Sequence, residues 1–136
     1  MPPRTKAIVA FADSDNRRDL ARVLEACEVE PIAASSVREV NDLLAACPTR
    51  VMFCDEGLPG GGIDRILQTS ISQTPPTRVV VCSLLGGVEE YLRAMEKGAF
   101  DFICPPYRLA EVAAIMNAAR GVGLIPRSRA AERSTP

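Results

Sequence analysis

The sequence alternates between short, nearly continuous apolar runs and longer stretches in which apolar residues recur three and four positions apart. Runs of the first kind are typical of strands that are buried on both faces of a parallel sheet. The second run contains Pro31, which has no N–H to donate, so this strand should lie at an edge of the sheet. The five predicted strands are Lys6–Phe11, Glu30–Ala34, Arg50–Cys54, Arg78–Ser83 and Asp101–Cys104.

The stretches that follow these runs predict helices with one apolar face each. Side chains that can cap a helix precede the first two, at Ser14 or Asp15 and at Ser35 or Ser36. Gly98 is expected to end the fourth helix. The apolar positions are Leu20, Val23, Leu24 and Cys27 in the first helix, Val37, Val40, Leu43 and Leu44 in the second, Val88, Tyr91, Leu92 and Met95 in the fourth, and Leu109, Val112, Ala113 and Met116 in the fifth, with a weaker third helix at about Ile63–Ser70.

Five strand-then-helix units predict an α/β fold, in which a doubly wound, five-stranded parallel sheet is flanked by five helices. One folded domain is expected at residues 1–120, and the polar, proline-containing stretch 121–136 is expected to be a linker or a disordered tail. In sheets of this kind the site lies beyond the carboxyl ends of the strands. Residues at these ends, including Asp13, Asp55 and Ser83, are therefore candidates for the site.

The composition excludes several classes of site. The 136 residues include no histidine, which excludes histidine-based acid–base catalysis, Ser-His-Asp triads and histidine metal sites. The formal net charge of −1 argues against direct nucleic-acid binding as the main role. The arginines of the last stretch could touch nucleic acid, but a solvated linker is the favoured interpretation.

The cysteines and the hydropathy pattern indicate a reducing compartment. None of the five cysteines is spaced as C-x-x-C, and Cys54, Cys82 and Cys104 are interpreted as core thiols rather than as a metal or redox site. No stretch approaches the roughly 20 apolar residues of a membrane span, and no signal peptide is recognised. The expectation is a cytoplasmic protein without membrane contact.

Three short motifs flank the predicted strands. Asp55 stands four residues before Pro59, in a D-x-x-x-P-G loop, and Ser83 ends the fourth strand. Gly98–Phe102 reads GAFDF and leads into the fifth strand, in the manner of a G-A-x-D-[YF] motif. Over about residues 5–120 the chain resembles the receiver domain of bacterial two-component response regulators, which has a (βα)5, flavodoxin-like three-layer sandwich.

The resemblance implies a role for each of these residues. Asp55 would be the phosphoacceptor, Ser83 would contact a phosphoryl oxygen, and Phe102 would be the switch aromatic that reports the state of Ser83. The face formed by the fourth helix, fifth strand and fifth helix would bind a protein partner, such as a sensor kinase or an output domain, or a second copy in a homodimer. The implied function is phosphorelay signal transduction, and the chain is not expected to be an enzyme.

The sequence departs from the family at the positions that handle charge. The family ends its first strand with two adjacent acids that hold Mg²⁺, whereas this chain has Phe11 and Ala12, with Asp13 one step later. Pro105 stands where the family has a lysine. Phosphoryl transfer relies on cations to neutralise the charge of the equatorial oxygens, and Mg²⁺ requires oxygen ligands. Mg²⁺ binding is therefore doubtful, and we interpret the chain as a degenerate, or pseudo-, receiver.

Other interpretations stay open. Asp55 could still be phosphorylated, with metal held weakly by Asp13 and Asp55, or it could be only a turn or helix-cap residue. Asp13 is favoured as part of a helix cap over a cation site. An unrelated small α/β enzyme is a third possibility, without a nucleophile–base pair or cofactor fingerprint to support it. Gly60–Gly62 are interpreted as a flexible loop, and the bond before Pro106 is expected to be cis, as is typical of the family.

Overall fold

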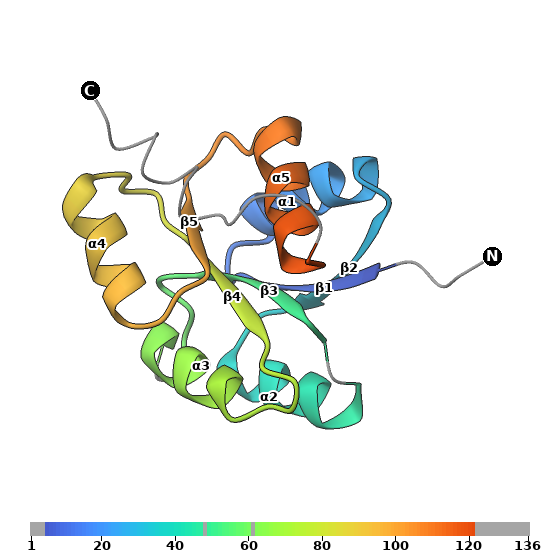
Figure 1. Ribbon diagram of the computed structural model, residues 1–136, viewed down its shortest axis with the longest axis vertical. Coiled ribbons are helices and arrows are strands. Elements are labelled where there is room, and N and C mark those ends of the chain that lie inside the picture. The colour runs from blue at the N-terminus through green and yellow to red at the C-terminus, as the bar shows by residue number, and fades with distance from the viewer. Residues whose placement is uncertain (1–4, 48, 61, 122–136) are drawn as a thin grey trace.

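A five-stranded parallel sheet forms the centre of the protein (Figure 1). The computed structural model describes residues 5–47, 49–60 and 62–121. Its strands are β1 (Thr5–Ala10), β2 (Val29–Ala34), β3 (Val51–Asp55), β4 (Arg78–Cys82) and β5 (Asp101–Ile103), in the spatial order β2-β1-β3-β4-β5. All four neighbouring pairs are parallel, and each strand lies within one residue of its predicted limits. The edge position predicted for the strand with Pro31 is confirmed.

Five helices cover the two faces of the sheet. They are α1 (Ser14–Ala26), α2 (Val37–Ala46), α3 (Gly62–Ile71), α4 (Val88–Glu96) and α5 (Leu109–Ala119). Helices α1 and α5 lie together on one face, and α2, α3 and α4 lie on the other (Figure 1). The doubly wound three-layer arrangement predicted from the sequence is therefore confirmed.

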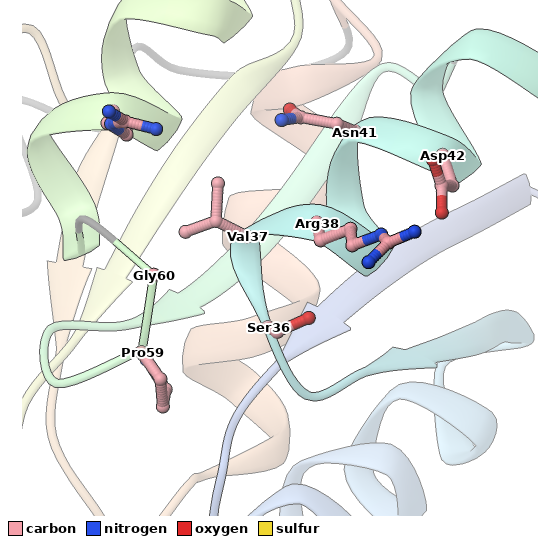
Figure 2. Close-up of a pocket in the computed structure, with 8 residues that line it drawn as sticks. Ser36, Val37, Arg38, Asn41, Asp42, Pro59 and Gly60 are labelled. Atoms are coloured by element: carbon pink, nitrogen blue, oxygen red, sulfur yellow. The ribbon is translucent and has the colours of Figure 1, made fainter.

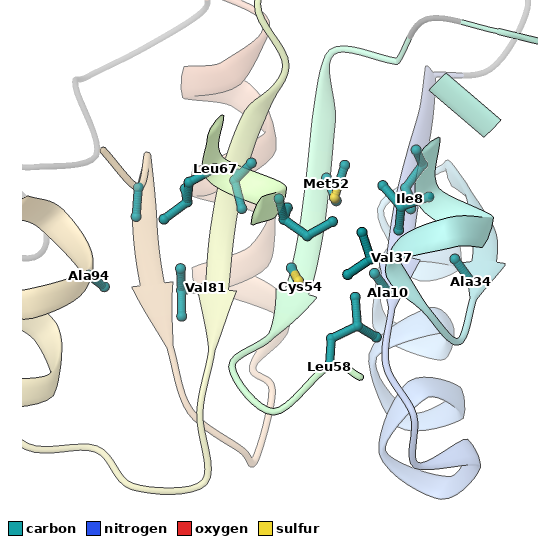
Figure 3. Close-up of a cluster of buried hydrophobic side chains, with 14 of the residues drawn as sticks. Ile8, Ala10, Ala34, Val37, Met52, Cys54, Leu58, Leu67, Val81 and Ala94 are labelled. Atoms are coloured by element: carbon teal, nitrogen blue, oxygen red, sulfur yellow. The ribbon is translucent and has the colours of Figure 1, made fainter. Parts of the chain in front are cut away.

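The sheet divides the core into two clusters because successive strand residues point to opposite faces. In β1, Ala7 and Val9 face α1 and α5, whereas Ile8 and Ala10 face α2, α3 and α4. Figure 3 shows the second cluster, in which aliphatic side chains from the strands meet those from the helices. The inner strands β1, β3 and β4 are thus largely buried on both faces, which explains why their runs in the sequence are continuously apolar rather than alternating. The edge strand β2 is partly exposed.

Helix capping follows the prediction at one helix and differs at another. The Ser36 hydroxyl accepts the N–H of Glu39 at 3.2 Å and caps α2, as predicted. The cap of α1 is Asp13, not Ser14 or Asp15, because the Asp13 carboxylate accepts the N–H of Asn16 at 2.9 Å while its own backbone is extended. The helix therefore begins one residue earlier than the serine–aspartate pair suggested.

The apolar face predicted for α4 is only partly buried. Val88 and Leu92 are exposed, Tyr91 and Met95 are half-buried, and the fully packed residue of this helix is Ala94. The short α4 covers the sheet near its β5 edge, so only one line of its residues reaches the sheet. The predicted apolar face is therefore confirmed for Tyr91 and Met95 and was wrong for Val88 and Leu92.

Two turn predictions are confirmed, and one lies partly outside the described residues. Gly98 follows α4 with a φ of +101°, the left-handed conformation of a helix stop, and the Pro105–Pro106 bond is cis. Residue 61 of the predicted glycine loop, and the predicted tail from residue 122 onward, lie outside the described residues. Within the described ranges, the helices are too short or too polar to cross a membrane.

Candidate functional site

Asp55 is the last residue of β3, at the carboxyl edge of the sheet. Its side chain is half-buried, and its Oδ1 accepts the backbone N–H of Gly57 at 3.3 Å. Its backbone carbonyl accepts the N–H of Leu58 at 3.1 Å, so a tight turn follows the strand. The carboxylate is thus held by the turn on one side and remains partly open to solvent on the other.

Ser83 follows β4, the strand next to β3, and is buried. Its hydroxyl donates to the carbonyl of Leu85 and accepts the N–H of the same residue, both at 3.1 Å. Its backbone N–H donates to the carbonyl of Ile103 at 3.1 Å, which ties the end of β4 to β5. Because a serine hydroxyl has a single hydrogen, this local turn uses its whole donor capacity.

The end of β1, on the other side of β3, is built around an aromatic ring. Phe11 is completely buried among residues of α1 and α5, and its ring meets that of Tyr107 edge-on with centroids 6.3 Å apart. The Phe11 carbonyl accepts a hydrogen bond from Nη1 of Arg17 at 2.7 Å. Ala12 is exposed, and so is Asp13, whose carboxylate caps α1.

Tyr107 is a residue at this edge that the sequence reasoning missed. Its hydroxyl donates to Oδ1 of Asn16 at 2.8 Å, which links the start of α5 to α1. Burial raises the pKa of Tyr107 well above its usual range, and the negative charge of nearby Asp55 raises it further. The only signal in the sequence was an aromatic residue one position after the two prolines.

In the middle of β5, Phe102 faces the layer formed by α2, α3 and α4 and is buried. Its ring meets that of Tyr91 edge-on with centroids 6.3 Å apart, which connects β5 to α4. Pro105 is half-buried and follows Cys104. Because this position is a proline, it places no cationic side chain beyond the end of β5.

The strand-end cysteines behave as core thiols. Cys54 and Cys82 are buried, and their burial raises the pKa of each thiol well above its ordinary value, so both stay protonated at neutral pH. Cys104 is only partly buried. Among the described residues, no three histidine, cysteine, aspartate or glutamate side chains gather in a way that could hold a metal ion.

The structure brings the predicted residues to one edge in a defined order. Because β3 lies between β1 and β4, Asp55 stands between the segment Phe11–Asp13 on one side and Ser83 on the other. Phe102 lies one strand further, in β5, on the face covered by α2, α3 and α4. The arrangement places one half-buried carboxylate beside a buried serine and an aromatic cluster.

Known proteins resemble this chain in sequence. It is 30% identical over 110 residues to the response regulator protein PilR of Pseudomonas aeruginosa and 30% identical over 112 residues to nodulation protein W of Bradyrhizobium diazoefficiens. The matches cover 80% and 79% of this chain but 24% and 48% of the two relatives, so the chain spans about a quarter and about half of their lengths. No family model matches the sequence.

The fold has a close counterpart among solved structures. A response regulator from Thermotoga maritima superposes with a TM-score of 0.76 at 18% identity, over 88% of this chain and 99% of that one. The shared architecture agrees with the two sequence matches, which both cover most of this chain. The chain therefore belongs to the receiver domains of two-component response regulators.

Proposed function

We propose that this receiver domain is degenerate and acts mainly as a protein-interaction module in a two-component pathway. The observation that carries the proposal is the end of β1, where Phe11 belongs to the core between α1 and α5. A side chain committed to that core cannot take part in a polar pocket at the sheet edge. Ala12, the next residue, has no oxygen in its side chain.

The remaining oxygen donors fit Mg²⁺ poorly. Asp13 already accepts the N–H of Asn16 as the cap of α1, and Asp55 is bonded to the N–H of Gly57. Mg²⁺ demands a near-octahedral set of oxygen ligands, and it is usually bound through one or two carboxylates together with phosphate. With Pro105 in place of a lysine, the edge has also lost a cation, and each lost group of this kind costs about 3 kcal/mol of transition-state stabilisation.

The contacts of Ser83 give further support. Its hydroxyl is occupied by Leu85, so contact with a phosphoryl oxygen on Asp55 would require breaking an existing hydrogen bond. The pocket that would register phosphorylation is therefore closed by its own turn.

A surface on the α4 side supports the interaction role. Leu84, Leu85, Val88 and Leu92, here called the leucine patch, are between 50% and 76% exposed. Val88 and Leu92 lie one turn apart on α4, and the two other leucines precede the helix. Exposed apolar residues that gather in this way are typical of protein–protein contacts. The proposed partners are a sensor kinase, an output domain or a second copy of the chain.

Amide NMR spectra recorded with millimolar Mg²⁺, and then with beryllofluoride as a mimic of the phosphoryl group, test the proposal. A degenerate pocket predicts unchanged amide resonances at Asp13, Asp55, Ser83 and Phe102. The matched control is Asp55→Asn, which removes the acceptor carboxylate. Resonances that shift in the native protein and stay fixed in this variant would contradict the proposal.

That contrary result would support the alternative function, a working receiver. In this alternative, Asp55 is phosphorylated and metal is held through Asp13 and Asp55. The half-buried position of the Asp55 carboxylate favours it, because a phosphodonor could reach the group. The fold and the sequence matches, which are those of receiver domains, argue against the other alternative, an unrelated small α/β enzyme.

A further inference from the structure

A cleft of about 440 Å³ lies between the first turns of α2 and the loop that joins β3 to α3 (Figure 2). Its volume is within the range of binding sites for small ligands and short segments. Val37 and Pro59 form its apolar part, and Arg38, Asn41 and Arg65 are its positive or polar lining. Helix α3 separates the cleft from α4, so it is distinct from the leucine patch (Figure 1).

Two arginines of the cleft are not neutralised. Within the described part of the chain, the side chains of Arg38 and Arg65 have no ion-pair or hydrogen-bond partner. The acids next to them in sequence are engaged elsewhere. Glu39 accepts the hydroxyl of Ser35 at 2.6 Å, and Asp64 pairs with Lys97 at 3.0 Å. Among the described residues that line the cleft, Asp42 is the single acid, which leaves two guanidinium groups against one carboxylate.

The base of the cleft is held in place by the backbone. The N–H of Val37 donates to the carbonyl of Pro59 at 3.3 Å, which ties α2 to the β3–α3 loop. Gly60 has a φ of +95°, and a Cβ at this position would lie 3.3 Å from Cβ of Val37. Glycine thus allows the loop to approach the helix closely. A base formed in advance lowers the ordering cost of binding.

Polar groups line the cleft on both α2 and α3, and Arg38 extends on the side of Asp42, away from Pro59 (Figure 2). Asn41 extends its amide from α2 toward α3, as Figure 2 shows. Arg65 belongs to α3, and Arg38 belongs to α2, so cationic groups border the apolar base from two elements. Guanidinium groups bind carboxylates through paired, charge-assisted hydrogen bonds.

The geometry points to a docking groove for an acidic segment of a partner protein. Carboxylates of that segment pair with Arg38 and Arg65, and an apolar side chain between them rests on Val37 and Pro59. A peptide fits these features better than a nucleic acid does. Nucleic-acid binding depends on many cationic contacts to the backbone, whereas this cleft has two arginines and contains Asp42. The groove is a second contact surface, distinct from the leucine patch.

A titration followed by amide NMR tests the groove. The probe is the blocked peptide Asp-Glu-Leu-Pro-Glu-Asp, and the comparison probe is its charge-reversed counterpart Lys-Arg-Leu-Pro-Arg-Lys. The acidic peptide should shift the amides of Val37, Asn41, Gly60 and Arg65, with millimolar affinity that weakens in added salt. The basic peptide should leave these amides unchanged.

Variants separate the groove from general charge attraction. Arg38→Gln and Arg65→Gln should each weaken binding about two- to fivefold, and the double variant about tenfold, as expected for exposed ion pairs. Both side chains are exposed, so the variants should remain folded. Arg22→Gln, a change of an exposed arginine on α1, is the matched control and should bind like the native protein.

Four results would overturn the inference. They are fixed amide resonances at the cleft with millimolar acidic peptide, equal binding of the basic peptide, equal binding by the double variant, and the same shifts produced by inorganic phosphate or by a thymidine oligonucleotide at equal concentration. These titrations contain neither Mg²⁺ nor beryllofluoride. The outcome is therefore independent of whether the receiver pocket is degenerate.

Discussion

Two neighbouring strands, β1 and β3, end at the same edge of the sheet and end very differently. β1 is followed by Phe11, whose ring is fully buried between α1 and α5. β3 ends in Asp55, whose carboxylate is half-buried and held by a turn. One strand end serves packing, and the other keeps a polar group at the surface. A receiver fold can therefore keep an acid at the end of β3 while the neighbouring strand end is absorbed into the core.

The largest effect should come from truncating the packed strand end. Phe11→Ala removes a fully buried ring and should lower the free energy of unfolding by about 3–5 kcal/mol, through lost burial and the cavity left behind. Asp55→Asn keeps the shape and an acceptor for the N–H of Gly57, and it should change the free energy by no more than about 0.5 kcal/mol. Urea unfolding followed by circular dichroism measures both. Similar losses in the two variants would remove the contrast between the strand ends.

The next largest effect should come from alkaline pH, which should lower the free energy of unfolding through groups buried on the packed side of the edge. The pKa of Tyr107 is raised by burial, so the folded protein keeps the hydroxyl proton after the unfolded chain has lost it. The stability that this group contributes is complete below about pH 10 and falls as the pH rises further. The upper limit of this fall is about 1.4 kcal/mol per pH unit. The actual fall should be smaller, because the ring is only half-buried and solvent screens its charge. The pKa values of Cys54 and Cys82 are also raised by burial, and they add to this fall from about pH 9.

Tyr107→Phe isolates the tyrosine contribution. The variant should lose about 1 kcal/mol near neutral pH, because Asn16 loses its hydrogen-bond donor. Above pH 10 its stability should fall less steeply than that of the native protein. Urea midpoints measured from pH 8 to pH 11 compare the two slopes, and parallel slopes would show that Tyr107 does not contribute to the alkaline loss.

The smallest effect concerns Asp13, which follows β1 and caps α1. As a helix cap, it should tolerate asparagine within about 0.5 kcal/mol, whereas Asp13→Ala should cost about 1 kcal/mol. Thermal unfolding of both variants, with and without Mg²⁺, measures the difference. An asparagine variant as unstable as the alanine variant would mean that the charge of Asp13, and not its capping geometry, is what the fold requires.

The fold could be predicted because its signals are local and repeated. The runs of the inner strands β1, β3 and β4 are largely apolar on both faces, and Pro31 marks β2 as an edge strand because it has no N–H to donate. The apolar spacing of α1 and α2 was also sufficient, since Leu20, Leu24 and Val40 are all buried. For α4 the same spacing misled, because how much of a helix is covered depends on its position over the sheet. Leu92 satisfies the helical period and is still exposed.

The site could be predicted by position but not by contact. The sequence placed Asp55 and Ser83 at the ends of neighbouring strands, and the structure agrees. The hydrogen bonds between the Ser83 hydroxyl and the backbone of Leu85 depend on the geometry of the loop. The residue type alone does not determine that geometry. The contact of Tyr107 with Phe11 joins residues far apart in the chain, so no local pattern predicts it.

The two outer strands limit how this protein can meet other molecules. β2 carries Pro31, which lacks a backbone donor, and β5 has only three residues. Neither border of the sheet is a good template for adding a strand from another chain, so aggregation by edge-to-edge pairing is disfavoured. Recognition is left to side chains on helices and loops. Changes in binding specificity during evolution therefore require only surface substitutions and leave the hydrogen bonds between the strands unchanged.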